Sequence, residues 1–343
     1  MFRAKIIDSF DSLLQIKKDW DNLFSQCGIN YPFLTFEWIS TWWKYFGKSN
    51  KLFVLVVIEH NEIVAIAPFM FTKRIMRGVP LKSITFLSNY HSNRIEMILL
   101  RKEYDIINFI LNYLLNASPC MDLIELGFIP EGCNTEKTLD KVLLSHRLRY
   151  LKFIDFASPY LNMNDQWDNY LNNRSKKLRH KLNSLNNKFK EQDNYEFLRF
   201  SDCYEDECVK KIFQVSEKTW KHTENSAIVS KKETLDFYTS IAEIASKRGW
   251  LDILILTIQE VPVAFDYKLN YNSTNYCLKI GYDLDYKSYS PGQFLMARSI
   301  RNAFEDGCQE FDFVGEKARF KMEWASSLRN HYKYLIFSNR FLG

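Results

Sequence analysis

The chain has 343 residues, a formal net charge of +5, and a composition that is 46% hydrophobic and 16% aromatic. This length allows two cores of about 150 residues each, and the 27 phenylalanines and 19 tyrosines exclude a disordered chain. The mild positive charge permits an anionic substrate without demanding a nucleic acid, so nucleic-acid binding is not expected.

The sequence also gives little support for a membrane protein, a disulfide-stabilised protein or a metal-binding protein. Apolar runs such as "FVLVVI" and "ILILTI" have the length of strands and fall far short of the roughly 20 residues of a membrane helix. The first residues, "MFRAKIIDSF", lack the apolar core of a signal peptide. Seven cysteines without paired spacing and six scattered histidines favour reduced thiols and no metal over a disulfide or zinc framework. We therefore expect a cytoplasmic protein without membrane insertion.

The first half predicts an alternation of strands and helices. In chain order we expect a strand at 4–10, helices at about 11–26 and 35–46, a hairpin at 51–71, a strand at 82–88, a helix at about 103–116, a strand at 121–127, a helix near 135–146 and a strand at 150–156. A basic helix, "NNRSKKLRHKLNSLNNKFK" at 172–190, follows, with Leu178, Leu182 and Leu185 as its apolar side. We interpret it as a solvated inter-domain helix near a phosphate-bearing substrate, and a tRNA-binding arm is the alternative.

The second half repeats the order of the first. It predicts a strand at 195–200, helices at about 204–222 and 232–248, strands at 250–259, 261–270 and 273–283, a helix at 289–307, a strand at 310–315, a short helix near 317–326 and a last strand at 332–338. Even the hairpins correspond, "LFVLVVIEHNEIVAIAP" to "LDILILTIQEVPVAFDY". An internal repeat of this kind predicts an α/β fold with mixed sheets.

The two copies differ after their third meander strand. The first half continues with "SNYHSNRIEMILL", whereas the second continues with "GYDLDYKSYSPGQF" and opens a helix at Pro291 and Gly292. Proline suits a first helical turn, and the glycine beside it leaves backbone N–H groups uncovered. Uncovered N–H groups at the positive end of a helix form an anion site, whereas the plainer interpretation is a loop that ends in Pro-Gly. The second copy is therefore expected to hold the cofactor.

Four segments carry a family resemblance: "FLTFEWISTWWKYFG", "VAIAPFMF", "GYDLDYKSYSPGQFLM" and "GCQEFDFVGEKARFKMEWA". With the element order, they resemble the GNAT acyltransferases, and the doubled arrangement is similar to the CelD/BcsL, BioF2-like and Fem-type branch. The resemblance implies tandem GNAT-like domains, with residues 1–160 as a degenerate copy that forms an acceptor wall and residues 161–343 as the domain that binds acyl-CoA. The last motif departs from the branch by one additional residue and by Phe320 where tyrosine is commoner, so no phenolic general acid is expected there.

The resemblance also implies roles for individual residues. The pyrophosphate of acyl-CoA is expected at the helix start, with Ser290, Pro291, Gly292, Gln293, Phe294, Leu295 and Arg298 as cofactor-binding residues. Backbone N–H groups of "CLKIGYD" would polarise the thioester carbonyl. Asp283 and Glu316 are the candidate catalytic carboxylates, and solvated loop charges are the alternative. Lys321 is expected to hold a substrate phosphate, the alternative being a surface lysine beside Trp324.

Acceptor-binding residues are expected at the strand end of the first half and around the second. They are Asn89, Tyr90, His91, Trp220, His222 and Tyr282. For the first three, a loop of small polar residues is the competing interpretation. Trp220 is commonly a core residue, and His222 is also a candidate base.

Three functional hypotheses from different classes are consistent with the sequence. The leading hypothesis is an acyl-CoA-dependent N-acyltransferase that adds an acetyl or 3-hydroxybutyryl-like group to the amine of a nucleotide-linked amino sugar for surface polysaccharide, as implied by a resemblance to FdhC-type enzymes. The second is a Fem-like transferase that uses aminoacyl-tRNA on a peptidoglycan precursor. The third is a non-enzymatic interaction protein with two degenerate GNAT copies, against which the Pro-Gly helix start argues.

Overall fold

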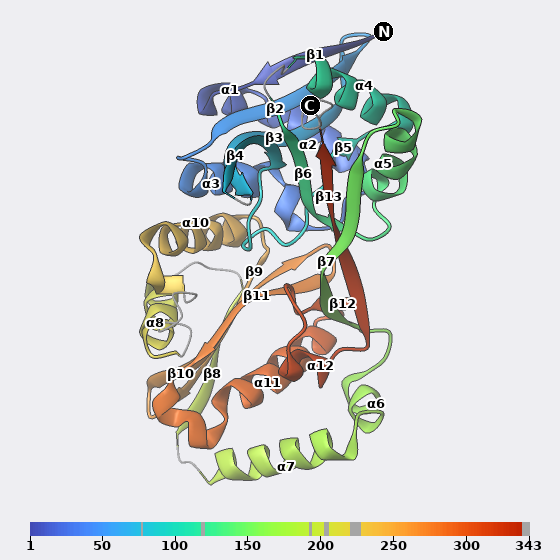
Figure 1. Ribbon diagram of the computed structural model, residues 1–343. Coiled ribbons are helices and arrows are strands. Elements are labelled where there is room, and N and C mark those ends of the chain that lie inside the picture. Colours follow the sequence, from blue (N-terminus) through green and yellow to red (C-terminus); the bar gives the residue numbers. More distant parts are fainter. Residues whose placement is uncertain (77, 118–120, 192–193, 202–205, 220–227, 338–343) are drawn as a thin grey trace. The chain divides into compact units, whose positions relative to one another are not determined.

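The computed structural model describes residues 1–76, 78–117, 121–191, 194–201, 206–219 and 228–337 (Figure 1). Contacts between residues divide the chain into two compact units. Unit 1 consists of Met1–Ala157 with Arg329–Gly343, and unit 2 consists of Ser158–Leu328. The chain therefore leaves unit 1 in the course of one strand and returns to it in the course of the last one.

Unit 1 is a mixed sheet with helices. Its elements are β1 (Phe2–Ile7), α1 (Phe10–Gln15), α2 (Lys17–Gln26), η1 (Pro32–Leu34), α3 (Phe36–Phe46), β2 (Lys51–Glu59), β3 (Glu62–Met76), β4 (Val79–Phe86), β5 (Ile98–Leu99), α4 (Glu103–Ala117), β6 (Leu123–Pro130), α5 (Asn134–Ser145), the first part of β7 (Tyr150–Asn162) and most of β13 (Ser327–Phe337). The strand order is β1-β2-β3-β4-β6-β13, and β5 pairs with β3. The β4–β6 pair is parallel and the β6–β13 pair antiparallel.

Unit 2 follows the same plan. Its elements are the end of β7, α6 (Trp167–Asn172), α7 (Lys176–Lys190), β8 (Tyr195–Phe200), α8 (Asp206–Glu217), η2 (Ile228–Ser230), α10 (Lys232–Lys247), β9 (Leu251–Ile258), β10 (Val261–Tyr271), β11 (Thr274–Tyr282), η3 (Leu284–Tyr289), α11 (Pro291–Glu305), β12 (Glu310–Asp312), α12 (Arg319–Met322) and the start of β13. The strand order is β8-β9-β10-β11-β12-β7. The predicted mixed α/β fold is confirmed. The predicted helix at 172–190 corresponds to α7, which begins at Lys176, and the short helix α6 before it was not predicted.

The last strand of each repeat lies in the sheet of the other repeat. β7, which ends the first repeat, pairs antiparallel with β12 in unit 2. β13, which ends the second repeat, pairs antiparallel with β6 in unit 1. The sequence predicts both strands, but it places the division of the chain between 160 and 161, inside β7, and assigns β13 to the second domain.

The two repeats share a turn geometry. His60 and Asn61 connect β2 to β3 with φ values of 51° and 67°, and Gln259 and Glu260 connect β9 to β10 with φ values of 48° and 66°. Two successive left-handed residues define the type I′ turn, whose twist matches that of a two-residue hairpin. The correspondence of the two hairpins in sequence is therefore also a correspondence in backbone conformation.

Helices cover both faces of the sheet in unit 2. Figure 1 shows α11 along one face and α8 with α10 on the other, and all three contact β9 or β10. Beyond α11 lies α7, which begins at Ser175, whose hydroxyl accepts a hydrogen bond from the N–H of Leu178 at 3.2 Å. The side chains at Leu178, Leu182, Leu185 and Phe189 are buried, so the apolar side of the basic helix packs against the other elements of unit 2.

Candidate active site

Helix α11 begins without a side-chain cap. Its N-cap residue, Ser290, has the left-handed conformation (φ 52°, ψ 48°) and makes no side-chain cap hydrogen bond. The carbonyl of Ser290 accepts hydrogen bonds from the N–H groups of Gln293 at 3.1 Å and Phe294 at 3.3 Å. Because no side chain of the cap offsets the partial positive charge of the helix end, this end favours an anion.

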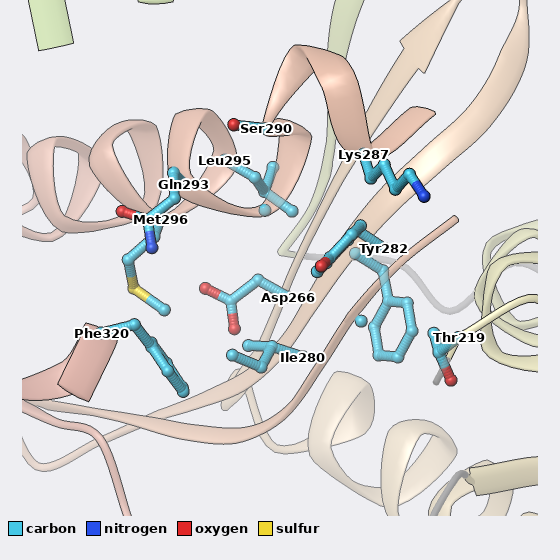
Figure 2. Close-up of a pocket in the computed structure, with 13 residues that line it drawn as sticks. Thr219, Asp266, Ile280, Tyr282, Lys287, Ser290, Gln293, Leu295, Met296 and Phe320 are labelled. Carbon is cyan, nitrogen blue, oxygen red and sulfur yellow. The ribbon is translucent and has the colours of Figure 1, made fainter. Parts of the chain in front are cut away.

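A cavity of about 320 Å³ lies beside this helix start (Figure 2). Its walls come from β10, β11, η3, α11, α12 and the residues that follow α8. The residues that line it are Thr219, Phe265, Asp266, Ile280, Gly281, Tyr282, Lys287, Ser290, Gly292, Gln293, Leu295, Met296 and Phe320. Mostly apolar walls with a few polar groups are typical of a small-molecule site.

The sheet opens beside the cavity. The parallel pairing of β11 with β12 runs from Thr274 and Glu310 to Tyr276 and Asp312, whereas β11 continues to Tyr282. The register of β11 against β10 also shifts within this stretch, as at a β-bulge. A strand that continues past its parallel partner offers backbone groups to a ligand. This is the splayed strand from which the sequence predicts carbonyl-polarising N–H groups.

Two glycines allow the close packing of the cavity wall. A Cβ on Gly281 would lie 2.5 Å from Cε1 of Phe265 and 2.9 Å from Cγ2 of Thr219. A Cβ on Gly292 would lie 3.1 Å from Cδ1 of Tyr282. All three side chains that approach these glycines line the cavity, so larger residues at either position would alter its shape.

Three lysine side chains and the Gln293 amide lie near the start of α11. Lys287 lines the cavity from η3, and its side chain is exposed. Lys181 of α7 donates a hydrogen bond to Oε1 of Gln293 at 3.0 Å and forms an ion pair with Glu323 at 3.2 Å. Lys188, on the same helix, donates to the carbonyl of Ser288 at 2.5 Å. The basic helix therefore contacts both α11 and the turn that precedes it.

The predicted cofactor-binding residues divide between two sides of α11. Ser290, Gly292, Gln293 and Leu295 line the cavity, as does Met296, which was not predicted, and Pro291 is buried in the first turn.

Phe294 and Arg298 lie on the other side of this helix. Phe294 stacks on Phe189 with ring centroids 4.0 Å apart, and the Arg298 guanidinium lies 5.8 Å from the ring centroid of Phe197. Residues 294 and 298 are four apart and so share a helix face, which differs from the face of Gly292 and Met296. Neither side chain is among those that line the cavity.

The two candidate catalytic carboxylates have different surroundings, and neither lines the cavity. Asp283 is 1% exposed, accepts a hydrogen bond from the N–H of Asp285 at 2.9 Å, and pairs with Lys218 at 3.0 Å. The Asp283 carboxylate raises the pKa of Lys218 through this hydrogen bond. Asp283 thus caps η3. Glu316 is exposed, in the turn after β12.

Lys321 holds the turn that contains Glu316. Its ammonium donates hydrogen bonds to the carbonyl of Val314 at 2.5 Å and to that of Glu316 at 3.1 Å. Val314 and Gly315 both have left-handed backbones, with φ values of 51° and 65°. A β-branched residue in this region is strained, so the turn needs such support. Burial lowers the pKa of Lys321.

Three predicted acceptor residues lie together in unit 1, after β4. Oδ1 of Asn89 accepts hydrogen bonds from Nε1 of Trp42 at 3.0 Å and from the N–H of His91 at 2.9 Å. His91 stacks on Phe46 with ring centroids 5.0 Å apart, and Tyr90 is 84% exposed. In unit 2, Tyr282 lines the cavity. Trp220 and His222 lie outside the described residues.

Sequence analysis missed Asp266. This carboxylate lines the cavity, is 1% exposed, and accepts hydrogen bonds from the Ser299 hydroxyl and, at 3.2 Å, from Sγ of Cys277. Burial raises the pKa of the Cys277 thiol, so this group is a hydrogen-bond donor rather than a thiolate. A signal was present: Asp266 and Lys268 are two charges at alternate positions of an otherwise apolar strand, which places both on one buried face.

Charged groups continue from Asp266 into the core. Lys268, fully buried, lies 3.6 Å from a carboxylate oxygen of Asp266 and 3.6 Å from one of Asp252. Burial alone would raise the pKa of Asp252, but Lys268 and Arg199 hold it below its ordinary value. Burial alone would lower the pKa of Lys268, but the two carboxylates raise it. Asp252 and Lys268 are therefore both ionised at neutral pH.

Comparison with known proteins identifies the class. Residues 176–322, all within unit 2, match the model of the acetyltransferase (GNAT) domain family. This part of unit 2 is therefore a GNAT-type acyltransferase domain, and the fold of the chain is that of tandem GNAT-like proteins. The predicted recognition and fold are thus confirmed. No curated protein matches this sequence.

Solved structures agree with this fold over nearly the full chain. FemX superposes with a TM-score of 0.63 at 11% identity, over 98% of this chain and 98% of that one. L-PGS from Bacillus licheniformis superposes with a TM-score of 0.57 at 12% identity, over 95% of this chain and 92% of that one. A tandem GNAT protein from the clavulanic acid biosynthesis pathway superposes with a TM-score of 0.52 at 8% identity, over 98% of this chain and 98% of that one. At these identities the likeness concerns the fold.

In the described part of the chain, every helix is too short or too polar to cross a bilayer. Among the same residues, His, Cys, Asp and Glu side chains form no group of three or more that could bind a metal ion.

Proposed function

We propose that this protein is an acyl-CoA-dependent N-acyltransferase whose acceptor is the amine of a nucleotide-linked amino sugar, such as a dTDP-3-amino-3,6-dideoxyhexose used for surface polysaccharide. The observation that carries the proposal is the start of α11, which has no side-chain cap and opens on the cavity where β11 continues past β12. A GNAT domain needs an acyl donor, and this arrangement supports a donor that bears phosphate.

Each part of an acyl-CoA has matching groups in unit 2. The pyrophosphate would lie at the N–H groups of α11, where Gly292 lets it approach the backbone and Lys287 adds a positive charge. The acyl end would lie among apolar side chains such as Leu295, Met296 and Phe320. When bound, the thioester supplies an activated acyl group to the amine.

The residues of this chain would act mainly by holding and polarising. Backbone N–H groups of β11 beyond Tyr276, where its pairing with β12 has ended, would stabilise negative charge on a carbonyl oxygen. Apolar walls exclude water, which would otherwise compete with the amine. Holding the two reactants in contact can supply several kcal/mol of the barrier reduction. Glu316 and Asp283 remain the predicted proton-handling carboxylates.

Ligand-dependent stabilisation tests the proposal. Acetyl-CoA, 3-hydroxybutyryl-CoA, CoA, dTDP-sugars and UDP-sugars would each be added in a thermal-shift measurement, because a ligand that binds only the folded state raises Tm. We expect CoA thioesters to raise Tm, and mass spectrometry of the incubated amino-sugar nucleotide to detect its acylated product. Absence of any effect of CoA or its thioesters would contradict the proposal.

A second function is favoured by the basic helix α7. Its Lys181 and Lys188 reach the same helix start, so a larger phosphate-bearing donor such as an aminoacyl-tRNA has cations available there. This would make the protein a Fem-like aminoacyl transferase acting on a peptidoglycan precursor.

A fluorescence-anisotropy titration with labelled tRNA separates the two functions. Under the second one, tRNA should bind and compete with CoA, and Lys181→Met with Lys188→Met should flatten the dependence of its affinity on salt. If tRNA binds no more tightly than an unrelated RNA of equal length while CoA binds, the acyl-CoA function stands.

A further inference from the structure

Asp266 is the one carboxylate among the described residues that line the cavity. Figure 2 shows it between Met296, Ile280 and Tyr282, in the middle of the side chains that form the walls. A carboxylate at such a position is expensive to bury unless it is paired, because burial removes the water that would solvate its charge. Its partners therefore indicate what the cavity can take.

The Asp266 carboxylate is held in place but not saturated. The Ser299 hydroxyl on α11 donates to Oδ2, and the Cys277 thiol on β11 donates to Oδ1 at 3.2 Å. A carboxylate offers about four lone-pair positions, so two donors leave acceptor capacity on both oxygens. Both donors are neutral groups, and neither neutralises the charge.

The negative charge of the cluster around Asp266 is also not fully balanced by its cations. Lys268 is shared, at 3.6 Å, between Asp266 and Asp252. Arg199, the other cation of the cluster, bonds Asp252 at 2.9 Å and also binds Asp306. Three carboxylates thus face two cations, which leaves a formal charge of −1 (2 − 3), and Asp266 is the member that faces the cavity.

We propose that Asp266 forms an ammonium-binding point in this cavity, which selects ligands with a primary amine over their neutral isosteres. An ammonium group carries the missing positive charge and has three donors for the unused lone pairs of the carboxylate. The inference deepens the proposed N-acyltransferase function, because it assigns the amine of the acceptor to a residue that sequence analysis did not select. Asp266 then orients the amine by accepting hydrogen bonds from its N–H groups.

The alternative is that Asp266 is purely structural, a means of joining β10, β11 and α11. In that case the cavity would treat an amine and its isosteric alcohol alike. Asp252 provides the matched control, because it belongs to the same cluster, shares Lys268, and is buried to a similar extent, but does not line the cavity.

Calorimetric titration with n-propylammonium and n-propanol tests the inference without any assumption about the natural substrate. For the wild-type chain we expect propylammonium to bind at least about tenfold more tightly, since a charge-assisted hydrogen bond is roughly twice as strong as a neutral one. Asp266→Asn should bring the ratio close to one, while Asp252→Asn should keep it. Equal or undetectable binding of the two probes to the wild type would overturn the inference, and that comparison needs no variant to fold.

The outcome is independent of the acyl donor. If CoA fails to bind but the ammonium preference is present and depends on Asp266, the proposed function fails and the amine site remains. If acyl transfer is found, Asp266→Asn should raise KM for the amine at least about tenfold while the Kd for CoA stays within about twofold of wild type. An unchanged KM in this folded variant would overturn the assignment.

Discussion

The Cδ1 atom of Tyr282 lies 3.1 Å from the position that a Cβ on Gly292 would occupy. This distance is shorter than an ordinary van der Waals contact, so the ring and the first turn of α11 are packed as closely as a glycine permits. The end of β11 and the start of the helix together form one wall of the cavity. Changes at Gly292 therefore act on shape and on charge at once.

Gly292→Asp is expected to abolish CoA binding while leaving the fold intact. The new carboxylate would stand beside the pyrophosphate at the helix end and would also press on Tyr282. We expect a loss of affinity of at least about tenfold, or about 1.4 kcal/mol, measured by calorimetry. Ser288→Asp is the control, since it adds the same charge at an exposed position that does not line the cavity. Unchanged affinity in folded Gly292→Asp would remove the helix start as the donor site.

Lys287 and Arg298 should differ in their effect on CoA. Lys287 lines the cavity, whereas Arg298 lies over the ring of Phe197 on another face of α11. Lys287→Met is expected to weaken CoA binding by about three- to tenfold, with a smaller loss at high salt because the side chain is exposed. Arg298→Met should leave the affinity within about twofold and lower Tm instead. If a binding titration showed that Arg298→Met weakens CoA binding more than Lys287→Met does, the phosphates would lie along the face of α11 that carries Arg298.

Glu316→Gln is expected to lower kcat/KM more than Asp283→Asn does. Glu316 is exposed and can turn toward a substrate, whereas Asp283 is occupied by Lys218 and the N–H of Asp285. Loss of a proton acceptor should weaken activity most at low pH, where the amine is protonated, whereas loss of an orienting group should lower the rate at every pH. If both variants stay within about threefold of wild type, under about 1 kcal/mol, neither carboxylate belongs to the catalytic machinery.

Lys321 should make stability depend on pH. Burial lowers its pKa from the ordinary 10.5, so between the lowered value and 10.5 the unfolded chain binds more protons than the folded one. Stability contributed at this site therefore rises with pH in that window. We expect urea unfolding to show that the stability of the wild type rises relative to that of Lys321→Met as the pH approaches 10.5, with Lys317→Met, at an exposed position, as the control. A constant difference would mean that the ammonium is not desolvated.

Sequence patterns predicted the parts of this fold that depend on local interactions. The hairpin turns at His60–Asn61 and Gln259–Glu260 follow from chain geometry within a few residues. The apolar side of α7 and the uncapped start of α11 follow from helical spacing and from the residues that can cap a helix.

Other features depend on partners far away in the sequence. Phe294 stacks on Phe189, which lies more than a hundred residues earlier in the sequence, so its side chain points away from the cavity. The position of Asp266 at the cavity depends on the parting of β11 from β12, and strand pairing between distant segments has no local signature. Lys321 was predicted as a phosphate ligand, while its contacts with Val314 and Glu316 appear only once the turn is folded.

The placement of β13 has a consequence for synthesis on the ribosome. Residues 1–157 emerge first, yet the sheet of unit 1 receives β13 only after residues 327–337 have been made. Until then the edge of β6 has no β13 to pair with, and an unpaired strand edge attracts other chains. We expect the nascent first half to depend on chaperones, and deletion of β13 to impair unit 1 although the deleted residues belong to the second repeat. Synthesis of residues 327–337 is thus the step that completes the sheet of unit 1.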